Sequence, residues 1–503
     1  MQATAKQILL TIFSGLGVIL GIVLLNGIIS RQYGIDSLGE YLLLRRIVSA
    51  LIPLALFGIA IGIPRNMGIA KDDPVIQTQI VMGGLQLFAW FGVPVIIVSG
   101  LFFILFPSLL GSTADTENTV IPLIVLAGAL ALHQIAFAYF RGQSRLGWAN
   151  LLQVVNIGLI PLTIVLFSTR GTVGELVLWH GILAGVIVIG VLLRPLILGL
   201  TLQKSISSMR QIRLKLLNYS LRRVGAVIGM VILLTLGPIL MANFASKEEL
   251  AYFSVGVQIN RMFFSLFGPI GIVFLPKFAY EVSKGMTEGV NRGLSMIFQA
   301  STAIGLFAMV HLFYFAKPIL ENWLGEAAPD GVLIFRFFAL SIPFYLLFEN
   351  ARNPIDAYSK KGYNSRNLLI SLGVLLMTLL GLVSLGKVTL SLALTWSYVV
   401  GYSVLGLLSL LTCWHLYRFK WSGLRTVFQI LFINAIILSI IWMAIRYLGL
   451  STESIWHLAI IEIIAFTVYI LCIFQLKQSW LSYLLYQIGI GKPTFEVSEA
   501  NKS

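Results

Sequence analysis

The chain has 503 residues, of which 58% are hydrophobic and only 11% are charged, and its mean hydropathy is +0.92. Soluble domains are about half apolar, so this composition excludes a soluble protein and predicts one that uses lipid as its solvent. The formal net charge of +15 raises nucleic-acid binding as an alternative. However, with the N-terminus placed inside, about 25 of the 35 basic residues fall in cytoplasmic segments, as multipass proteins require. We therefore expect no nucleic-acid partner.

Apolar blocks of about 20 residues follow one another along the chain, the length that crosses a bilayer as a helix. Six are expected in the first half, near residues 8–29, 41–63, 76–105, 120–140, 148–168 and 174–200. A basic elbow around Arg210 precedes eight more, near 217–243, 251–276, 294–316, 332–350, 366–386, 388–415, 426–448 and 455–476. The sequence thus predicts an all-α polytopic membrane protein of about fourteen transmembrane helices.

The first six helices and the next six look like copies of one another. GEYLLLRRIVSALIPLALFGIAIGIPR in the first group resembles ELAYFSVGVQINRMFFSLFGPIGIVFLPK in the second, and the NLL that begins at Asn150 recurs at Asn367. Because both groups start on the same side, they predict parallel repeats about an axis along the membrane normal. The expected domains are a six-helix lobe over 1–203, a second over 204–416, two accessory helices over 417–477 and a polar cytoplasmic tail over 478–503.

Four further segments carry a family likeness through their order and spacing: RQYGIDSLGEY, FRGQSRLGWANLLQ, LLNYSLRRVGAVIG and RNPIDAYSKKGYNSRNLL. They resemble the polysaccharide-transport flippases, the Wzx-like branch of the multidrug/oligosaccharidyl-lipid/polysaccharide exporter superfamily. The resemblance implies a V-shaped pair of lobes in the bacterial inner membrane that works without a cofactor. Its cargo would be an undecaprenyl-pyrophosphate-linked oligosaccharide, moved to the periplasmic leaflet by alternating access for O-antigen or lipopolysaccharide synthesis. A polysaccharide polymerase and a chain-length regulator are the implied partners.

Intramembrane arginine is the feature that best fits such a cargo. A guanidinium at membrane depth is costly unless it is paired or hydrated, and its planar donor fork fits phosphate oxygens. Arg261 is expected near mid-membrane with Gln258 and Asn260 beside it. We rank these three first as substrate contacts. The alternative for Arg261 is an interhelical pair or a carbonyl cap.

Four more residues are candidate substrate contacts, with weaker placement. Arg45 and Arg46 are expected close to the outer end of their helix, where long side chains also simply reach the interface. Arg336 is expected near a similar outer end, and His133 lies within an apolar helix. In the lipid-linked precursor flippases that the chain resembles, cationic side chains of helices 2 and 8 line the cavity, which favours Arg45 or Arg46 together with Arg261.

A charged cluster at the cytoplasmic end of the tenth helix is the candidate gate. Glu349, Arg352 and Asp356 are spaced i, i+3 and i+7, so they share one helix face. With Arg141 at the matching end of the fourth helix, they predict ion pairs between the lobes that break when the lobes rock. A local capping cluster is the alternative.

Few residues suit ion coupling or metal chemistry. Glu462 is the one clearly intramembrane carboxylate, and it lies in the last helix, outside the repeated core, where an interhelical hydrogen bond explains it. The two cysteines, Cys413 and Cys472, lie apart in apolar blocks and match neither a disulfide framework nor a metal-ligand spacing. We expect no metal site.

Three other functions compete with a flippase. A multidrug-type cation antiporter of the same superfamily predicts carboxylates in the lobes, where this sequence has arginines. A membrane-embedded polymerase or glycosyltransferase needs acid and base groups on a large external loop, and the loops here are short. An ion channel predicts a repeated re-entrant filter segment. We therefore expect a transporter and not an enzyme.

The positive-inside rule makes the topology testable. Both termini, the elbow around Arg210 and the loop at Lys360 and Lys361 are expected to face the cytoplasm. In a background without the two native cysteines, a cysteine placed at either loop should resist a membrane-impermeant maleimide in intact cells. A cysteine placed at Thr116 should react. The opposite labelling pattern would overturn the fourteen-helix topology.

Overall fold

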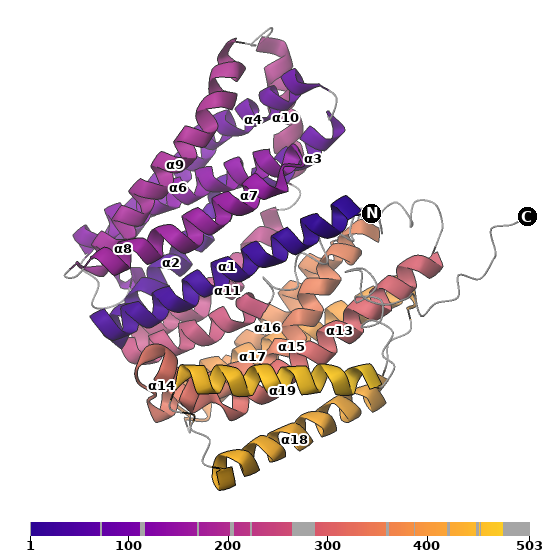
Figure 1. The fold of residues 1–503 in the computed structure, drawn as a ribbon. Helices are drawn as coiled ribbons and strands as arrows, with labels where there is room; N and C mark the ends of the chain where they lie inside the picture. The colour runs from indigo at the N-terminus through magenta and orange to yellow at the C-terminus, as the bar shows by residue number, and fades with distance from the viewer. Residues whose placement is uncertain are drawn as a thin grey trace, which may run out of the picture. The chain divides into compact units, whose positions relative to one another are not determined.

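The computed structural model describes residues 2–70, 73–110, 116–168, 171–201, 206–221, 224–263, 287–358, 362–386, 388–419, 423–448, 452 and 454–475. Within these ranges the regular structure is entirely helical (Figure 1). The first half has α1 (Gln2–Tyr33), α2 (Ile35–Leu56), α3 (Ile59–Ile69), α4 (Pro74–Leu87), η1 (Phe88–Gly92), α5 (Val93–Leu105), η2 (Pro107–Leu110), α6 (Thr116–Gly142), α7 (Leu146–Gln153), η3 (Val154–Leu159), α8 (Ile160–Phe167) and α9 (Val173–Thr201). The remainder has α10 (Ile206–Leu221), α11 (Val224–Phe244), a helical segment over 247–263, α13 (Thr287–Tyr314), α14 (Ala316–Leu324), α15 (Pro329–Tyr358), α16 (Tyr363–Ser384), α17 (Leu390–Tyr417), α18 (Gly423–Leu448) and α19 (Ile455–Gln475).

Length and hydropathy make most of these helices candidate membrane spans. Among the described residues, 11 helices qualify, or up to 12 spans when the bent pair α2 and α3 counts as one. The span expected over 217–243 corresponds to a shorter apolar helix, Ile228–Phe244, and the span expected over 251–276 runs beyond the described residues. The all-α polytopic membrane class is confirmed, whereas the count of fourteen stays a prediction.

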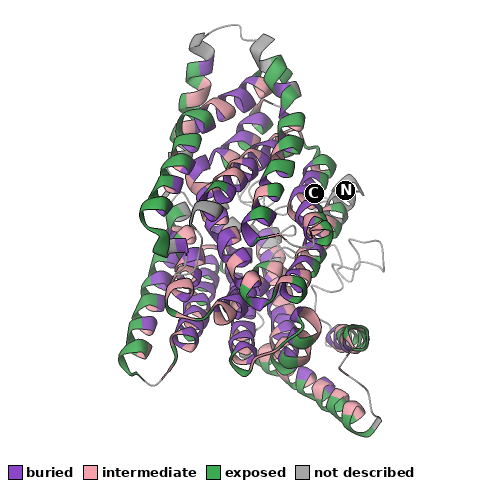
Figure 2. Cartoon of the chain, turned by 90° about the vertical axis from the view of Figure 1, so that its left-hand side faces the viewer, coloured by how far each residue is buried: buried purple, intermediate pink, exposed green. Residues whose placement is uncertain are grey.

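The outward faces of the helices carry large apolar side chains, as contact with lipid requires. Figure 2 shows exposed residues along these faces and buried residues where helices pack against one another. Phe167 is 86% exposed and Leu105 is 72% exposed. Exposed apolar patches of this extent are rare on soluble monomers. In a bilayer these side chains contact apolar lipid tails, so their exposure costs little free energy.

The helix expected over 41–63 is in fact two helices that meet at a bend of 52°. The break falls at Phe57 and Gly58, whose φ angles are 46° and 82°, and the Phe57 N–H closes the end of α2 on the Pro53 carbonyl. Glycine adopts a positive φ freely, so Gly58 gives the chain a place to turn. In addition, α2 begins at Ile35, six residues before the expected start near 41.

Two of the expected spans contain a π-helical stretch. In each, the residue after the stretch bonds five residues back: Val93 N–H to the Phe88 carbonyl, and Ile160 N–H to the Val155 carbonyl. Pro94 and Pro161 come directly afterwards, and each lacks the N–H that an α-helical ladder needs. The wider turn therefore accommodates a proline inside a span, and it frees a carbonyl in the process.

Contacts divide the chain into two compact units. The N-terminal unit comprises Leu10–Gln258 and Leu376–Thr395, and the C-terminal unit comprises Met1–Leu9, Ile259–Leu375 and Trp396–Ser503. These boundaries follow packing, whereas the expected lobes follow the repeat, so the lobe boundaries stay predictions. Of the expected tail, residues 478–503, none lies within the described residues.

In the N-terminal unit, small residues let helices approach closely. A Cβ on Gly21 would lie 2.9 Å from the Cα of Gly158, and one on Gly39 would lie 2.4 Å from the Lys247 carbonyl oxygen. Membrane helices lack a hydrophobic drive to associate, so such close packing is a main source of their stability. It holds α1 against η3, and α2 against the segment 247–263.

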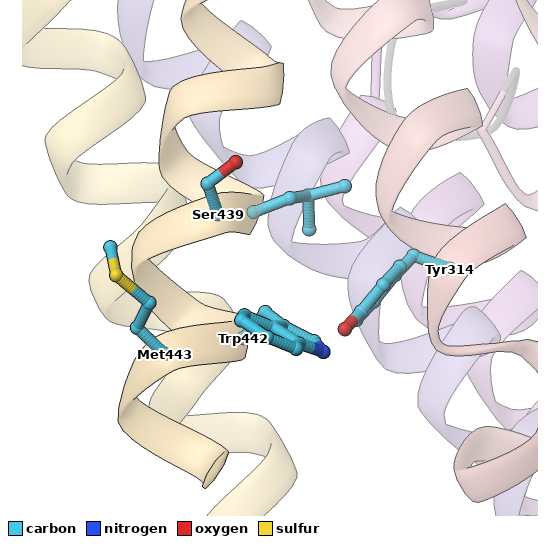
Figure 3. Close-up of a pocket in the computed structure, with 5 residues that line it drawn as sticks. Tyr314, Ser439, Trp442 and Met443 are labelled. Atoms are coloured by element: carbon cyan, nitrogen blue, oxygen red, sulfur yellow. The ribbon is translucent and has the colours of Figure 1, made fainter. Parts of the chain in front are cut away.

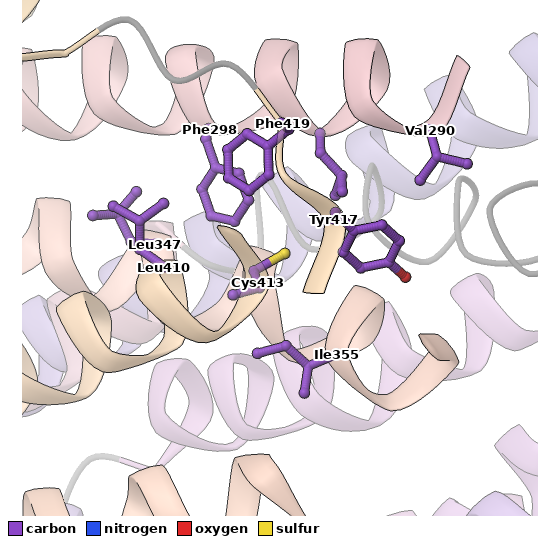
Figure 4. Packing of buried hydrophobic residues seen from close by; sticks show 10 residues of the cluster. Val290, Phe298, Leu347, Ile355, Leu410, Cys413, Tyr417 and Phe419 are labelled. Carbon is purple, nitrogen blue, oxygen red and sulfur yellow. The ribbon is translucent and has the colours of Figure 1, made fainter. Parts of the chain in front are cut away.

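The C-terminal unit has its own core, in which α13, α15 and α17 meet (Figure 4). Phe298 and Phe419 stack there at 5.0 Å between ring centroids, over the buried Cys413. On another side of α13, Tyr469 of α19 donates a 2.7 Å hydrogen bond to the Ala303 carbonyl. The C-terminal helices are thus packed onto the unit rather than appended to it.

Candidate functional site

A chain of polar groups runs through the packed helices of the N-terminal unit. Nη1 of Arg45, on α2, lies 3.2 Å from Nδ1 of His180 on α9. Nε2 of His180 lies 2.8 Å from the backbone oxygen of Asn156 in η3, and Nδ2 of that asparagine lies 3.1 Å from Nδ1 of His133 on α6. Both histidines and Asn156 are buried. Four segments far apart in the sequence therefore converge on one polar site.

The partners of His180 determine its protonation state and tautomer. A guanidinium only donates, so Nδ1 must accept from Arg45. A backbone carbonyl only accepts, so Nε2 must carry a hydrogen and donate to Asn156. His180 is consequently a neutral imidazole with its proton on Nε2. An imidazolium would point an N–H at the Arg45 guanidinium and lose that bond.

The π-helical stretch η3 explains why the Asn156 carbonyl is available. In an α-helix it would accept from the Ile160 N–H, four residues on. Here that N–H bonds to the Val155 carbonyl instead. The Asn156 carbonyl is thereby released to hold His180, and the side-chain Oδ1 of Asn156 stays buried without a hydrogen-bond partner.

Arg45 keeps a net positive charge at this site. Within the described residues, the groups that contact its guanidinium are neutral: the His180 imidazole, and the Tyr41 ring, whose centroid is 5.9 Å from the guanidinium carbon. No carboxylate within the described residues forms an ion pair with it. Arg45 also lies about ten residues into α2, roughly 15 Å from its start, and Arg46 beside it is buried. The expectation that both lie near a helix end is therefore wrong.

Arg261, the first-ranked candidate, belongs to the C-terminal unit, where it is exposed. The buried Tyr345 of α15 lies within electrostatic range of Arg261, Glu349 and Arg352. Glu349 is buried and pairs with Arg352 at 3.4 Å, one turn along the same helix. Glu349 and Arg352 thus form a local ion pair on α15, and their role as a gate stays a prediction.

The two amides beside Arg261 take part in interhelical hydrogen bonds. Nδ2 of Asn260 donates to Oγ of Ser341 at 2.8 Å, within the C-terminal unit. Oε1 of Gln258 accepts from Nδ2 of Asn26 at 3.0 Å, within the N-terminal unit. Both amides have packing partners, and their assignment to the substrate stays a prediction.

The remaining candidate residues lie outside the chain of polar groups around His180. Arg336 donates from Nε to the Phe313 carbonyl at 3.2 Å, next to the C-terminal end of α13, as a carbonyl cap does. Arg141 is exposed at the end of α6, with its guanidinium 5.6 Å from the Phe137 ring centroid. The side chain of Asp356 lies outside the described residues.

The hollow shown in Figure 3 is a different kind of feature. It has a volume of about 350 Å³, lies between α13 and α18, and is lined by Tyr314, Leu438, Ser439, Trp442 and Met443. No charged side chain lines it. Its lining offers neutral hydroxyl and indole donors, but no cation to balance the charge of an anionic headgroup.

Glu462 has a specific partner in the C-terminal unit. Its carboxylate oxygens lie 3.0 and 3.2 Å from Nδ1 of His311 on α13, and Phe307 stacks on that imidazole at 4.0 Å. This is an interhelical contact between α19 and α13, of the kind expected for this residue. This contact accounts for the carboxylate inside the bundle, and its dispensability for transport stays a prediction.

Exchange of Glu462 for glutamine should therefore be mild. The amide oxygen still accepts from Nδ1 of His311, so the expected cost in stability is about 0.6 to 2 kcal/mol. Gradient-dependent transport per inserted molecule should stay within about twofold of wild type. Loss of transport at normal protein level would show that this pair carries the coupling ion.

Sequence reasoning missed His180 and Asn156. Both are polar residues inside apolar spans, the same signal that selected His133. They are singled out by their hydrogen bonds to residues of other helices, and a local sequence pattern does not predict such partners.

Comparison with known proteins gives the fold. No family model and no curated protein matches the chain. The structure "Lipid II flippase MurJ, inward closed conformation" is similar over 92% of this chain and 98% of that one, with a TM-score of 0.66 and 15% identity. The eukaryotic MATE transporter AtDTX14 is similar over 86% and 99%, with a TM-score of 0.52 and 13% identity. The chain therefore has the fold that these two membrane transport proteins share.

Proposed function

We propose that the chain is a flippase that moves an undecaprenyl-pyrophosphate-linked oligosaccharide from the cytoplasmic to the periplasmic leaflet by alternating access. The observation that carries this proposal is the charge on Arg45, which is half-buried among packed helices and contacts neutral partners. An uncompensated guanidinium at membrane depth is costly, so it implies an anionic ligand. The fold shared with a protein named as a lipid II flippase supports the same class.

In this proposal the arginines bind the pyrophosphate. Arg45 in the N-terminal unit and Arg261 in the C-terminal unit each offer a planar fork of donors that matches two phosphate oxygens. Arg46 adds positive potential, which draws the headgroup in while the prenyl chain stays in lipid. Glu349 and Arg352 would change partners when the units move, which makes them the gate in this mechanism.

The proposal is tested in proteoliposomes that contain the purified full chain. One probe is a fluorescent polyprenyl pyrophosphate that carries a disaccharide, with flipping read as protection from a membrane-impermeant quencher. The other is the lipophilic cation ethidium, driven by an imposed pH gradient. Flipping of the anionic lipid without ethidium transport supports the proposal. Ethidium transport without lipid flipping would assign the chain to cation antiport instead.

A further inference from the structure

We infer that His180 positions Arg45 and takes up a proton when the anionic headgroup binds, which makes binding by this chain dependent on pH. The inference rests on the proposed function, because it needs an anion at Arg45. It goes beyond that function by naming a residue that acts through the arginine and the proton it exchanges.

The starting state is set by geometry. Without an anion, the lone pair of Nδ1 on His180 holds the Arg45 guanidinium at 3.2 Å, and the Asn156 carbonyl holds the other side of the ring at 2.8 Å. The ring is therefore neutral and fixed in orientation. The guanidinium is held by a weak, neutral acceptor that an anion easily replaces.

Anion binding removes the hydrogen-bond donor of Nδ1 and places a negative charge beside it. Phosphate oxygens accept the Arg45 N–H groups in place of Nδ1, so the lone pair of His180 is left without its donor. A proton from water then binds Nδ1, and the new N–H faces the anion. The Nε2–H bond to Asn156 is unchanged in this step, so the ring does not move. The product is an imidazolium beside a guanidinium, with both charges offset by the pyrophosphate.

The other groups around His180 do not supply that charge. On α2, Arg45 contacts His180, and the Tyr41 ring lies beside that arginine. On α6, His133 contacts Asn156, the residue whose carbonyl holds His180, and not a carboxylate. The described residues of α4, η3 and α8, which also surround α9, include no titratable side chain. An anionic ligand is thus the group that can stabilise an imidazolium here.

The variant His180→Gln separates positioning from titration. A glutamine amide can donate to the Asn156 carbonyl and accept from Arg45, as the neutral imidazole does, but it cannot take up a proton. His457→Gln is the matched control, because His457 is exposed on α19 in the other unit.

The experiment measures binding of farnesyl pyrophosphate to the full chain in nanodiscs by calorimetry between pH 6 and 8, in buffers of different ionisation enthalpy. In every variant the titration of the probe itself changes the affinity, and this shared change is subtracted. For each unit fall in pH, the affinity of wild type and of the His457→Gln control should then rise by up to about tenfold more than that of His180→Gln. They should also take up roughly one more proton per site. Equal proton uptake in wild type and His180→Gln overturns the inference.

Two further outcomes are informative. If wild type does not bind the probe at all, the proposed function fails, which is distinct from binding without proton uptake. If His180→Gln is not recovered folded, histidine ¹⁵N NMR of the wild type decides: one of the five imidazoles should change from neutral to imidazolium at saturating probe. No such change contradicts the inference.

Discussion

Replacing Arg261 with alanine is expected to abolish export of the lipid-linked oligosaccharide while the protein remains inserted. The side chain is exposed, so its removal should cost little stability. Losing two charge-assisted hydrogen bonds to phosphate should lower transport by about a hundredfold or more. Surface polysaccharide should disappear, and precursor should accumulate on the cytoplasmic leaflet, where a membrane-impermeant oxidant of the sugars cannot reach it in intact cells.

Lysine at position 261 is the sharper test. It keeps the charge but loses the bidentate fork, so an intermediate loss of about tenfold is expected if phosphate geometry matters. Arg446→Ala is the matched control, because Arg446 is also exposed, belongs to the same unit and has its guanidinium 5.5 Å from the Trp442 ring. Full activity of Arg261→Gln would place the headgroup elsewhere, with Arg45 and Arg46 next.

Replacing Gly406 with alanine is expected to cause the largest loss of stability from a single methyl group. A Cβ there would lie 2.2 Å from the Phe344 carbonyl oxygen, which is backbone and cannot rotate away. Helices α15 and α17 would have to separate, at a cost of about 3 kcal/mol or more. The melting temperature of the detergent-solubilised protein, followed by size-exclusion chromatography, measures the effect.

The control for that substitution is Gly373→Ala on α16. A Cβ at this position meets no atom within 4 Å. Alanine favours a helix over glycine by about 1 kcal/mol, so the control should melt at or slightly above the wild-type temperature. Equal melting of the two variants would mean that α15 and α17 do not pack as closely as described.

The sequence by itself determined the class of the protein and most of its spans. Blocks of about 20 apolar residues are a local property, because each helix satisfies its own backbone hydrogen bonds in lipid. For example, the span expected over 174–200 is observed as α9, Val173–Thr201. The cost of placing a charge inside an apolar span is likewise local, so the sequence alone marks Arg45, Arg46 and Arg261 as candidates.

Only the tertiary structure decided which of these polar residues meet. Arg45 and His180 are 135 positions apart, and Glu462 and His311 are 151 positions apart, so no periodicity relates them. The freed carbonyl of Asn156 depends on a π-helical turn, and the bend after Phe57 depends on two backbone angles rather than on hydropathy. Hydropathy places a segment in the membrane, but the partner of a polar side chain is set by how helices pack, and that depends on the whole chain.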